Sequence, residues 1–368
     1  MSEWKECKLG DVLVFQRGHD LPKTEMVEGN YPVAGSNGII GFHSKYTTKG
    51  PGITIGRSGN IGTPHFYKNN FWAHNTVLYV KDFKGNSEIF LYYFLKTIDF
   101  KQFNTGSAVP SLNRNHIHEL LVEIPPLSEQ KSIASVLSSL DDKIDLLHRQ
   151  NATLEKMAET LFRQWFVERC PEPVEGEEKE EWKIGKLGDE FDFTMGASPP
   201  GESYNEEGKG IPMYQGNADF GFRFPTNRVF TTDPKRFAEK YDTLISVRAP
   251  VGAQNMAKDR CCIGRGVAAF RLKKDSSFYT YTYFKMKSLM DEIKQFNETG
   301  TVFGSITKSD FENIDVLLPD VETIRKFQDV LKPIDDKIIM NTTQIRTLTS
   351  LRDTLLPKLM SGEVRVEM

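Results

Sequence analysis

Apolar residues between positions 127 and 168 recur at alternating intervals of four and three residues. A seven-residue hydrophobic repeat is typical of a coiled-coil seam and is narrower than the apolar stripe of an ordinary core-facing helix. Pro125 and Pro126 precede the pattern, and Ser128 is a suitable N-cap, so we predict one long helix over 127–168. Its predicted seam consists of Ile133, Leu137, Leu140, Ile144, Leu147, Asn151, Leu154, Ala158, Leu161 and Trp165.

The same spacing returns near the C-terminus and supplies a partner for this seam. The tetrapeptide Asp141–Ile144 reappears as Asp335–Ile338, and a second long helix is predicted over 321–362. If the helices are antiparallel and Asn151 faces Asn341, every seam position of one helix meets a seam position of the other. A buried Asn pair is a common device for fixing such a register. The second seam consists of Phe327, Leu331, Ile334, Ile338, Asn341, Ile345, Leu348, Arg352, Leu355 and Leu359.

The remainder of the chain is also written twice. The segment Trp4–Asp11 resembles Trp182–Asp189, and Lys101–Asn104 matches Lys294–Asn297. A repeat with so long a period indicates duplicated domains rather than a solenoid. The chain is therefore predicted to be a pseudo-two-fold repeat of a globular part followed by a long helix, with the larger globular part second.

Both globular parts are predicted to be β-rich with one internal helix. Helices are expected over Ser87–Phe103 and Thr280–Phe296, and the extra residues near Ser198–Gly210 are expected to form a surface insertion. Short apolar runs between glycine-bearing turns indicate strands. These runs are Val12–Phe15, Gly52–Ile55, Thr76–Val80, Leu120–Ile124, Leu244–Arg248 and Val267–Phe270. The predicted class is α/β (α+β), with two β-rich globular domains joined by two long helices that form an antiparallel coiled coil.

Composition limits the function without fixing it. The chain has 368 residues, 39% of them apolar, which is enough for two cores besides the helices. A net charge of −3 is not the strongly basic balance of a protein that binds nucleic acid by bulk charge. The stretch Glu168–Glu181 is acidic and too charged to pack, so it is predicted to be a linker.

Six segments follow from these patterns: a globular domain over 1–126, a spacer helix over 127–168, an acidic linker over 169–181, a second globular domain over 182–320, a second spacer helix over 321–362 and a tail over 363–368. The four cysteines lack zinc spacing, and no secretion signal or membrane-spanning run is apparent. We therefore expect a reduced, cytoplasmic protein that has no membrane partner.

The duplicated architecture resembles the specificity subunits of type I restriction–modification systems. Both halves open with Trp-Lys-x-x-Lys-Leu-Gly-Asp, and Pro125–Ala134 begins the first helix. Thr105–Leu112 lies upstream of that run, and Leu355–Val364 forms the tail of the second helix. The second half departs from the pattern, because Pro319–Glu322 replaces the Pro-Pro-Leu-x-Glu-Gln signature.

The resemblance implies that each globular part is a target recognition domain for one half of a split double-stranded DNA sequence. It also implies that the helices are the spacer between these domains and the docking surface for two adenine methyltransferase subunits, which restriction subunits join. S-adenosylmethionine, ATP and Mg would be held by those partner subunits, with no cofactor and no catalysis in this chain. Two readers on a rigid rod suit half-sites roughly 34 Å apart, one turn of DNA.

Polar residues in the glycine-rich loops are the candidates for DNA contact. Arg can pair bidentately with guanine, Asn and Gln with adenine, and hydroxyl groups can bind phosphates. The plainer interpretation is that they are ordinary solvated turn residues. The candidates are Ser36, Asn37, Lys45, Arg57, Ser58, Asn60, Ser107 and Asn113 in the first half, and Tyr214, Gln215, Asn217, Arg248, Arg265, Thr301 and Ser305 in the second.

Other functions have less support in the sequence. His116 and His118 lie two residues apart in a segment expected to lead into a strand, which is a weak signal for a metal site. Phe162, Trp165 and Phe166 at the end of the first helix suit either core packing or contact with a methyltransferase. Two alternatives stay open: a coiled-coil scaffold whose domains bind protein or glycan, and the recognition chain of a type IIB-like system.

Overall fold

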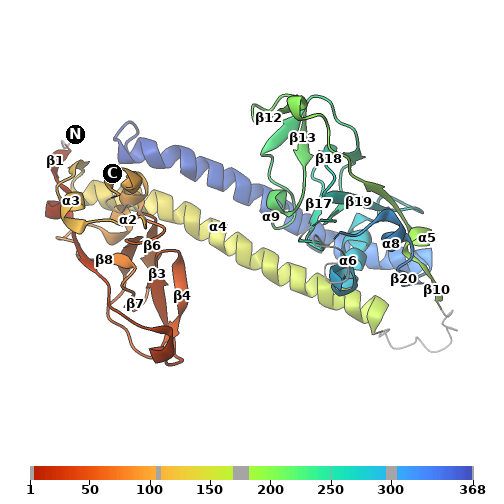
Figure 1. Cartoon of the computed structure of the whole chain (residues 1–368), viewed down its shortest axis with the longest axis horizontal. Helices are drawn as coiled ribbons and strands as arrows, with labels where there is room; N and C mark the ends of the chain where they lie inside the picture. Colours follow the sequence, from red (N-terminus) through yellow and green to blue (C-terminus); the bar gives the residue numbers. More distant parts are fainter. Residues whose placement is uncertain (1–3, 105–108, 169–181, 249, 296–304, 367–368) are drawn as a thin grey trace. The chain divides into compact units, whose positions relative to one another are not determined.

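The computed structural model describes residues 4–104, 109–168, 182–248, 250–295 and 305–366 (Figure 1). The predicted linker over 169–181 therefore lies outside the described residues, as do the candidates Ser107 and Thr301. The chain divides into two compact units, and each is described by itself. Unit 1 contains residues 1–145 and 347–368, and unit 2 contains residues 146–346.

Unit 1 is built on a four-stranded antiparallel sheet with a smaller three-stranded sheet beside it. The larger sheet has the order β2 (Val14–Arg17), β8 (Val77–Asp82), β5 (Gly52–Gly56) and β6 (Pro64–Tyr67). The smaller has the order β4 (Gly38–His43), β3 (Tyr31–Gly35) and β7 (Trp72–Ala73). A separate ladder joins β1 (Lys5–Lys8) to β9 (Leu121–Ile124), and the short helices are α1 (Leu9–Val12), η1 (Lys23–Glu25) and α3 (Arg114–His118).

Helix α2 (Glu88–Lys96) contributes to the core of unit 1 and is shorter than predicted. Ser87 caps it by accepting a bond from Phe90 N, and Phe90 packs in one cluster with Ile53 of β5. The predicted continuation to residue 103 is wrong. Asp99 instead accepts a bond from Lys101 N and begins the 3-10 helix η2 (Phe100–Phe103), because a side chain that caps a new turn competes with continuing the old helix.

Local capping also shapes two other segments of unit 1 and corrects the prediction for one of them. Val12 ends helix α1 rather than beginning a strand, since Lys8 N donates to Asp11 and closes a turn. His116 and His118 lie in helix α3, which Asn113 caps by accepting a bond from Asn115 N. At Val12 a local side-chain hydrogen bond thus outweighs the strand pattern, whereas the segment with His116 and His118 leads into strand β9 as expected.

Unit 2 repeats this strand order. Its main sheet is β11 (Phe191–Met195), β19 (Val267–Leu272), β16 (Thr243–Ser246) and β17 (Gln254–Met256), and β10 (Lys183–Lys186) pairs with β20 (Asp315–Leu318). The smaller sheet has five strands, ordered β12 (Tyr204–Asn205), β14 (Val229–Thr231), β13 (Ile211–Tyr214), β18 (Cys261–Ile263) and β15 (Phe237–Ala238). The helices are α5 (Leu187–Glu190), η4 (Gly201–Ser203), η5 (Asn217–Asp219), α6 (Tyr279–Ser288), α7 (Met290–Gln295) and α8 (Lys308–Glu312). The predicted internal repeat is confirmed at the level of topology.

The additional residues of the second globular part extend the smaller sheet of unit 2. The residues predicted as a surface insertion form η4 and strand β12, which pairs with β14. A buried bond of 2.7 Å joins the hydroxyl groups of Ser203 and Thr231 beneath this pairing. The helix predicted over 280–296 is interrupted at Leu289, where α6 ends and α7 follows.

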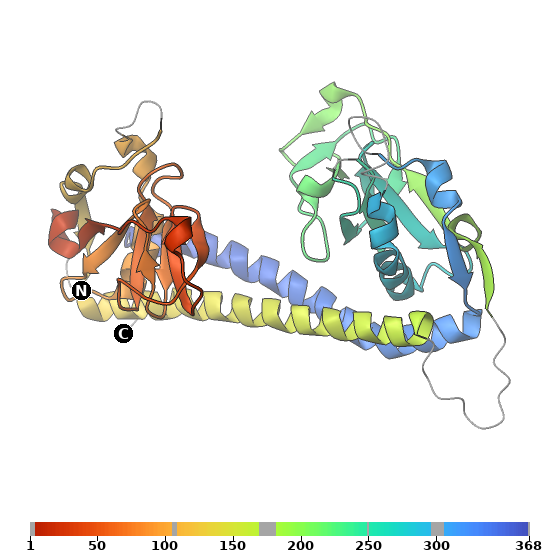
Figure 2. The ribbon, with the colours of Figure 1, turned by 60° about the horizontal axis from the view of Figure 1, so that its bottom comes forward.

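Two long helices contribute to both units: α4 (Leu127–Phe162), which continues as a π-helical turn η3 (Arg163–Val167), and α9 (Val321–Met360). Within unit 2 they lie side by side (Figures 1 and 2), and Asn341 Nδ2 donates to Asn151 Oδ1 at 2.9 Å. The Trp165 and Phe327 rings lie 5.8 Å apart, so higher numbers on one helix meet lower numbers on the other. Both pairings agree with the heptad register predicted from the sequence.

In unit 1 the helices are also antiparallel. Asp141 of α4 bonds to Arg352 of α9 at 2.6 Å, and Glu129 pairs with Arg365, which follows α9. Leu137 and Leu355 belong to the same apolar cluster. Of the other predicted seam residues, Ile133, Ile144, Leu147, Leu331 and Ile338 are buried, and Leu140, Leu154, Leu161, Ile345 and Leu348 are half-buried.

The aromatic residues at the end of the first long helix are part of the core. Phe162 and Phe166 are buried, and both rings stand edge-on to Phe327 at 5.6 and 4.9 Å. Trp165 is half-buried against the same residue. Among the described residues, none of the helices combines the length and apolarity that a membrane span requires.

Candidate nucleic-acid interface

The strands of unit 1 bring separate polar loops together at one end of its sheets. The loop after β5 is held from two sides by its backbone, because Arg57 N donates to Thr76 O at 2.8 Å and Leu112 N donates to Arg57 O at 2.9 Å. Gly59 N donates to Pro110 O at 3.0 Å. Residues more than 50 positions apart in the sequence are thus fixed beside one another by main-chain bonds alone.

Unit 2 holds the equivalent loop with equivalent bonds. Val247 N donates to Gly266 O at 2.9 Å, and Ile306 N donates to Val247 O at 3.2 Å. An isolated antiparallel bridge joins Arg248 to Ser305, just as one joins Ser58 to Ser111 in unit 1. The backbone arrangement is repeated, whereas the side chains that it presents differ.

The exit of the first main-sheet strand belongs to the same arrangement. In unit 1, Gly18 N donates to Val77 O at 3.0 Å, and in unit 2 Gly196 N donates to Val267 O at 2.9 Å. Side chains repeat this link. Asn75 Nδ2 donates to Asp20 in unit 1, and Arg265 Nε donates to Ser198 Oγ at 3.1 Å in unit 2.

The smaller sheet adds a turn to each arrangement. His74 N donates to Ala34 O at 3.0 Å, and Gly264 N donates to Tyr214 O at 2.8 Å. We refer to these assembled loops as the loop cluster of each unit. It comprises residues 17–20, 35–38, 56–62, 74–76 and 109–113 in unit 1, and residues 195–198, 215–219, 246–248, 250–252, 264–266 and 305–307 in unit 2.

One glycine in each main loop is required by the backbone. Gly62 has φ +80° and Gly252 has φ +88°, and each donates its N–H back to the end of the preceding strand, at 2.8 and 2.9 Å. A Cβ at Gly62 would lie 2.3 Å from Phe100 Cβ. A side chain at this position would therefore meet both conformational strain and a steric clash.

Most of the predicted contact residues lie in the loop clusters. Asn37 and Asn60 are exposed and Ser36, Arg57 and Ser58 are half-buried. Asn113 is exposed, although its side-chain oxygen caps α3. In unit 2 the exposed members are Gln215, Asn217, Arg248, Arg265 and Ser305. No comparison tests their contact with DNA, which stays a prediction.

Two predicted residues do not belong to this group. Tyr214 is buried, and its hydroxyl donates to Asn227 Oδ1 at 2.6 Å, so its prediction as an exposed loop residue is wrong. The cause is that β13 extends to this residue and pairs there with Ile263 of β18. Lys45 is exposed but follows the far end of β4, where Tyr31 faces His43, away from the 35–38 turn.

The cluster of unit 1 also contains charged residues that the sequence did not single out. Arg17 and Arg114 are exposed and flank it. Burial, and then the positive charge of Arg17, lower the pKa of Arg57, whereas the charge of Asp20 acts in the opposite direction. The sequence signal that points to Arg17 is the repeat between the two halves of the chain. Arg17 directly precedes Gly18, which is the counterpart of Gly196 in the second half.

His118 has a structural role in place of a metal site. Its Nε2 accepts a bond from Phe15 N at 2.9 Å, and burial followed by the nearby Arg114 charge lowers its pKa. Throughout the part of the chain that the structure describes, His, Cys, Asp and Glu side chains form no group of three or more that could hold a metal ion.

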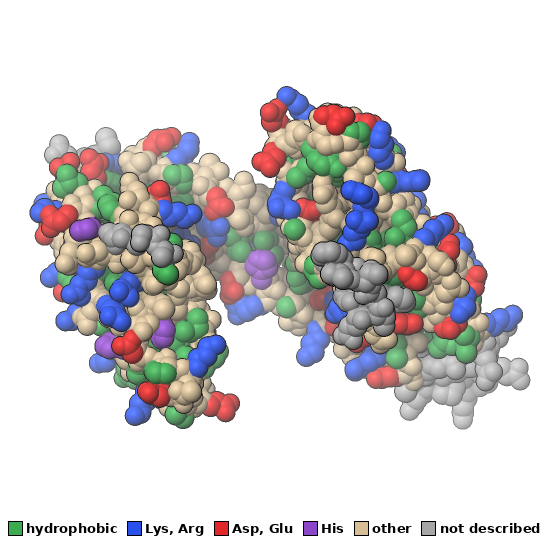
Figure 3. Space-filling model, in the orientation of Figure 1, with side chains coloured by type: hydrophobic (Ala, Val, Ile, Leu, Met, Phe, Trp, Pro, Cys, Tyr) green, Lys and Arg blue, Asp and Glu red, His purple; other side chains and the backbone are tan. Residues whose placement is uncertain are grey.

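The surfaces around these loops are mixed in charge. Both units expose Lys and Arg side chains with Asp and Glu among them (Figure 3).

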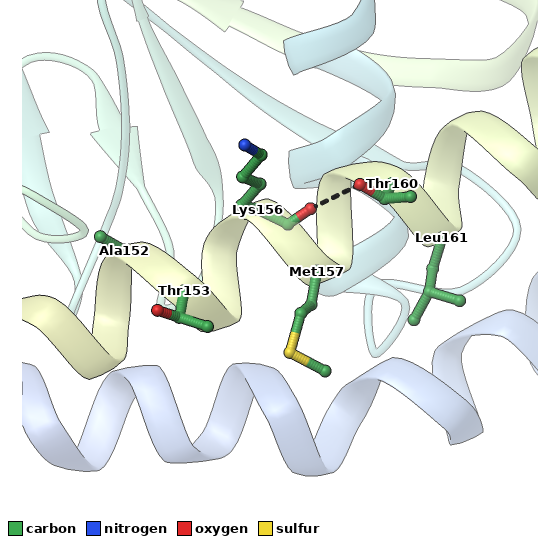
Figure 4. A pocket seen from close by; sticks show the side chains of 6 residues that line it. All are labelled: Ala152, Thr153, Lys156, Met157, Thr160 and Leu161. Atoms are coloured by element: carbon green, nitrogen blue, oxygen red, sulfur yellow. Dashed lines mark hydrogen bonds between the residues drawn. The ribbon is translucent and has the colours of Figure 1, made fainter.

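A second surface feature is a hollow of about 600 Å³ on α4, where Met157 and Leu161 extend from the helix on the side away from Lys156 (Figure 4). Met157 is 49% exposed. The hollow is apolar, unlike the loop clusters.

The sequence matches the family described as "Type I restriction modification DNA specificity domain" over residues 1–156 and 179–350. It is 32% identical to the putative type I restriction enzyme MjaX specificity subunit of Methanocaldococcus jannaschii, over 85% of this chain and 77% of that protein. It is 27% identical to the MjaIX specificity subunit of the same organism, over 76% of this chain and 69% of that protein.

The fold is similar to a solved structure as well. The crystal structure of the type I restriction–modification S subunit from M. genitalium aligns with a TM-score of 0.69 and 22% identity, covering 99% of this chain and 96% of that one. The two family matches fall on the two halves that share strand order. The chain therefore belongs to the type I restriction–modification DNA specificity family, whose members are non-catalytic subunits for DNA recognition.

Proposed function

We propose that each unit reads one half of a bipartite double-stranded DNA target through its loop cluster. The observation that carries the proposal is the repeated backbone scaffold, in which equivalent main-chain bonds present different side chains. A scaffold of this kind can offer the same docking geometry to two half-sites while reading different bases, because base readout depends on side chains in the grooves.

The arginines of the two main loops are suited to base contact. Arg57 Nη1 donates to Asn75 O at 3.2 Å, and a guanidinium has five N–H donors, so the bond orients Arg57 and leaves donors for a base edge. Arg248 is exposed one position further along the equivalent loop. The two units would therefore direct their arginines to different positions of their half-sites.

The long helices would connect the readers and hold the partner subunits. The seam residues of α4 and α9 are buried or half-buried and suit a rigid spacer. The apolar hollow around Met157 suits the docking of one of two adenine methyltransferase subunits. Restriction subunits would join through these partners, which would hold S-adenosylmethionine, ATP and Mg, and the complex would act on DNA in the cytoplasm.

The test is an adenine-methylation map of DNA from cells that express this chain with its methyltransferase. We expect a split motif methylated in both halves. Arg57→Ala should relax one base position in one half-site, and Arg248→Ala one in the other, each by roughly 10- to 100-fold, since a good bidentate pair discriminates by about 1–3 kcal/mol. Lys45→Ala, outside the loop cluster, is the control and should leave the motif unchanged.

Other results would count against the proposal. A continuous motif would mean that one unit alone reads DNA. Methylation no greater than that of the methyltransferase alone, with both proteins associated, would favour a scaffold that binds protein or glycan. Cleavage at fixed distances on both sides of the motif would instead indicate a type IIB-like assembly.

A further inference from the structure

A polar groove in unit 1 adjoins the loop cluster. It has a volume of about 800 Å³ and lies between the exit of β2, Lys81 of β8 and Arg114 of α3. Arg17 and Asp20 line this groove and also belong to the loop cluster, so the two surfaces are continuous. A duplex that rests on the loops would thus bring its backbone to the groove.

The groove is rich in positive charge. Three cationic side chains, those of Arg17, Lys81 and Arg114, line it together with one carboxylate, that of Asp20. The carboxylate is already engaged, because it lies 3.6 Å from Arg17 Nη2 and also accepts a bond from Asn75.

Two further acids near the groove are engaged with other cations. Asp82 follows Lys81 in β8, and its carboxylate accepts a bond from Lys84 N at 2.8 Å and lies 3.5 Å from Lys84 Nζ. Glu119 follows α3, but its carboxylate is held by Lys8 Nζ at 2.6 Å. The effect is visible on neighbouring groups. Burial, and after it the charge of Arg114, lower the pKa of His118, whereas the charge of Glu119 acts in the opposite direction. The groove therefore presents cations in excess of anions.

Unit 2 has no such excess at the equivalent positions. The main-sheet pairing places Met195 where unit 1 has Arg17. Arg271 follows Phe270 of β19 as Lys81 follows Val80 of β8, where the unit 1 register shifts. Arg271 is bound by both oxygens of Asp242, at 2.8 and 2.7 Å. Lys308 begins α8 as Arg114 begins α3, and its Nζ lies 3.4 Å from Glu312. Of the three groove cations of unit 1, one is therefore replaced by an uncharged residue in unit 2, and the counterparts of the other two are paired with carboxylates.

We infer that the groove of unit 1 binds a phosphate of the DNA backbone and that unit 2 makes no corresponding contact. The inference rests on the proposed function. DNA carries one charge per about 1.7 Å of its axis, and a protein cation that neutralises a phosphate releases a condensed counterion. A cation already paired with a protein carboxylate gains less from the exchange. The two units therefore contribute unequally to the salt-dependent part of DNA affinity.

The experiment uses the full chain in complex with its methyltransferase and two duplexes, one with the mapped motif and one with that motif scrambled. Dissociation constants are measured over a range of salt concentrations. Arg114→Ala and Lys81→Ala should each weaken binding to both duplexes by roughly five-fold at 0.15 M salt and lower the log–log salt slope by about 1. Lys308→Ala in unit 2 is the matched control and should leave the slope unchanged.

The possible outcomes separate this inference from the function on which it rests. If wild-type complex shows no salt-dependent DNA binding, both fail. If it binds DNA but Arg114→Ala, Lys81→Ala and the charge reversal Arg114→Glu keep the wild-type slope, the phosphate site alone is rejected. A relaxed methylation motif in the groove variants would show base reading and would also reject it, whereas an unchanged motif with a lower slope supports it.

Discussion

Arg223 shows how a single residue attaches the globular part of unit 2 to both of its helix segments. It is fully buried, and its Nη2 lies 2.5 Å from Glu155 of α4 and 3.2 Å from Asp335 of α9. Its guanidinium carbon stands 3.9 Å from the centre of the Tyr283 ring of α6. Burial is the main cause that raises the pKa of Asp335, so this carboxylate depends on its partner to remain charged.

Replacing Arg223 by Leu should destabilise unit 2 strongly. The substitution leaves the buried Asp335 carboxylate without its cation, whereas Glu155 keeps its pair with Lys287 Nζ at 2.6 Å. Removal of one partner from a buried ion pair costs about 3–5 kcal/mol. Denaturant unfolding of the full chain measures the change. Arg325→Leu, which removes the exposed pair with Glu322, is the control and should change stability by less than about 1 kcal/mol. Equal effects of the two substitutions would contradict this role.

At the scale of elements, the Asn151–Asn341 pair fixes how α4 and α9 meet in unit 2. Both residues are buried, and Asn151 Nδ2 also donates to Thr342 Oγ1 at 3.2 Å. Amides in an otherwise apolar seam favour one register, because any slip would bury them without partners.

The single substitution Asn151→Leu should lower the free energy of unfolding by about 1–3 kcal/mol, since it leaves the Asn341 amide unpaired. The double variant Asn151→Leu/Asn341→Leu should recover most of that loss, because both polar groups are then removed together. A double-mutant cycle by denaturant unfolding tests the coupling. Additive losses would show that the two amides do not act as a pair.

The same helices show which features are predictable from sequence. The heptad spacing depends only on seam residues that recur at fixed intervals along the sequence. It therefore predicts the two helices and places Asn151 opposite Asn341. The strand order was not predictable, because pairing such as that of β5 with β8 depends on contacts between distant segments. Local capping by Asp99 ended the predicted helix over 87–103 early and began a separate 3-10 helix.

The candidate site was predictable to a similar extent. Glycine-rich turns indicated Arg57, Ser58 and Arg248, which the structure places in equivalent loops. Tyr214 was misassigned, since its loop-like neighbours Gln215 and Gly216 hide the fact that the strand extends to it. Arg17 and Arg114 were missed because their proximity arises from the packing of α3 beside β2, which no local pattern reports.

At the scale of the whole molecule, the helix segments between the units should set the distance between half-sites. Four residues inserted after Asp145 and four more after Arg346, where the compact units divide, lengthen each helix by about 6 Å. We expect a methylation motif with unchanged half-sites and roughly two more unspecified base pairs between them. Insertion in α4 alone is the comparison and should abolish methylation, because it shifts one seam against the other. An unchanged spacing in the doubly extended chain would contradict a spacer role.

The loops 56–62 and 246–252 follow equivalent strands, β5 and β16, and have equal length in the sequence. Each closes on a glycine that donates to the equivalent backbone position at the end of its strand. Main-chain bonds to the framework thus hold both loops, and in unit 2 the Ser246 hydroxyl adds a bond to Pro250 O at 2.8 Å. An exchange of these coding stretches between the two halves of one gene would deliver each loop into a frame that already fits it. New binding preferences would then arise by exchange within a single gene, because each transferred loop would fold on a framework that already supports its backbone.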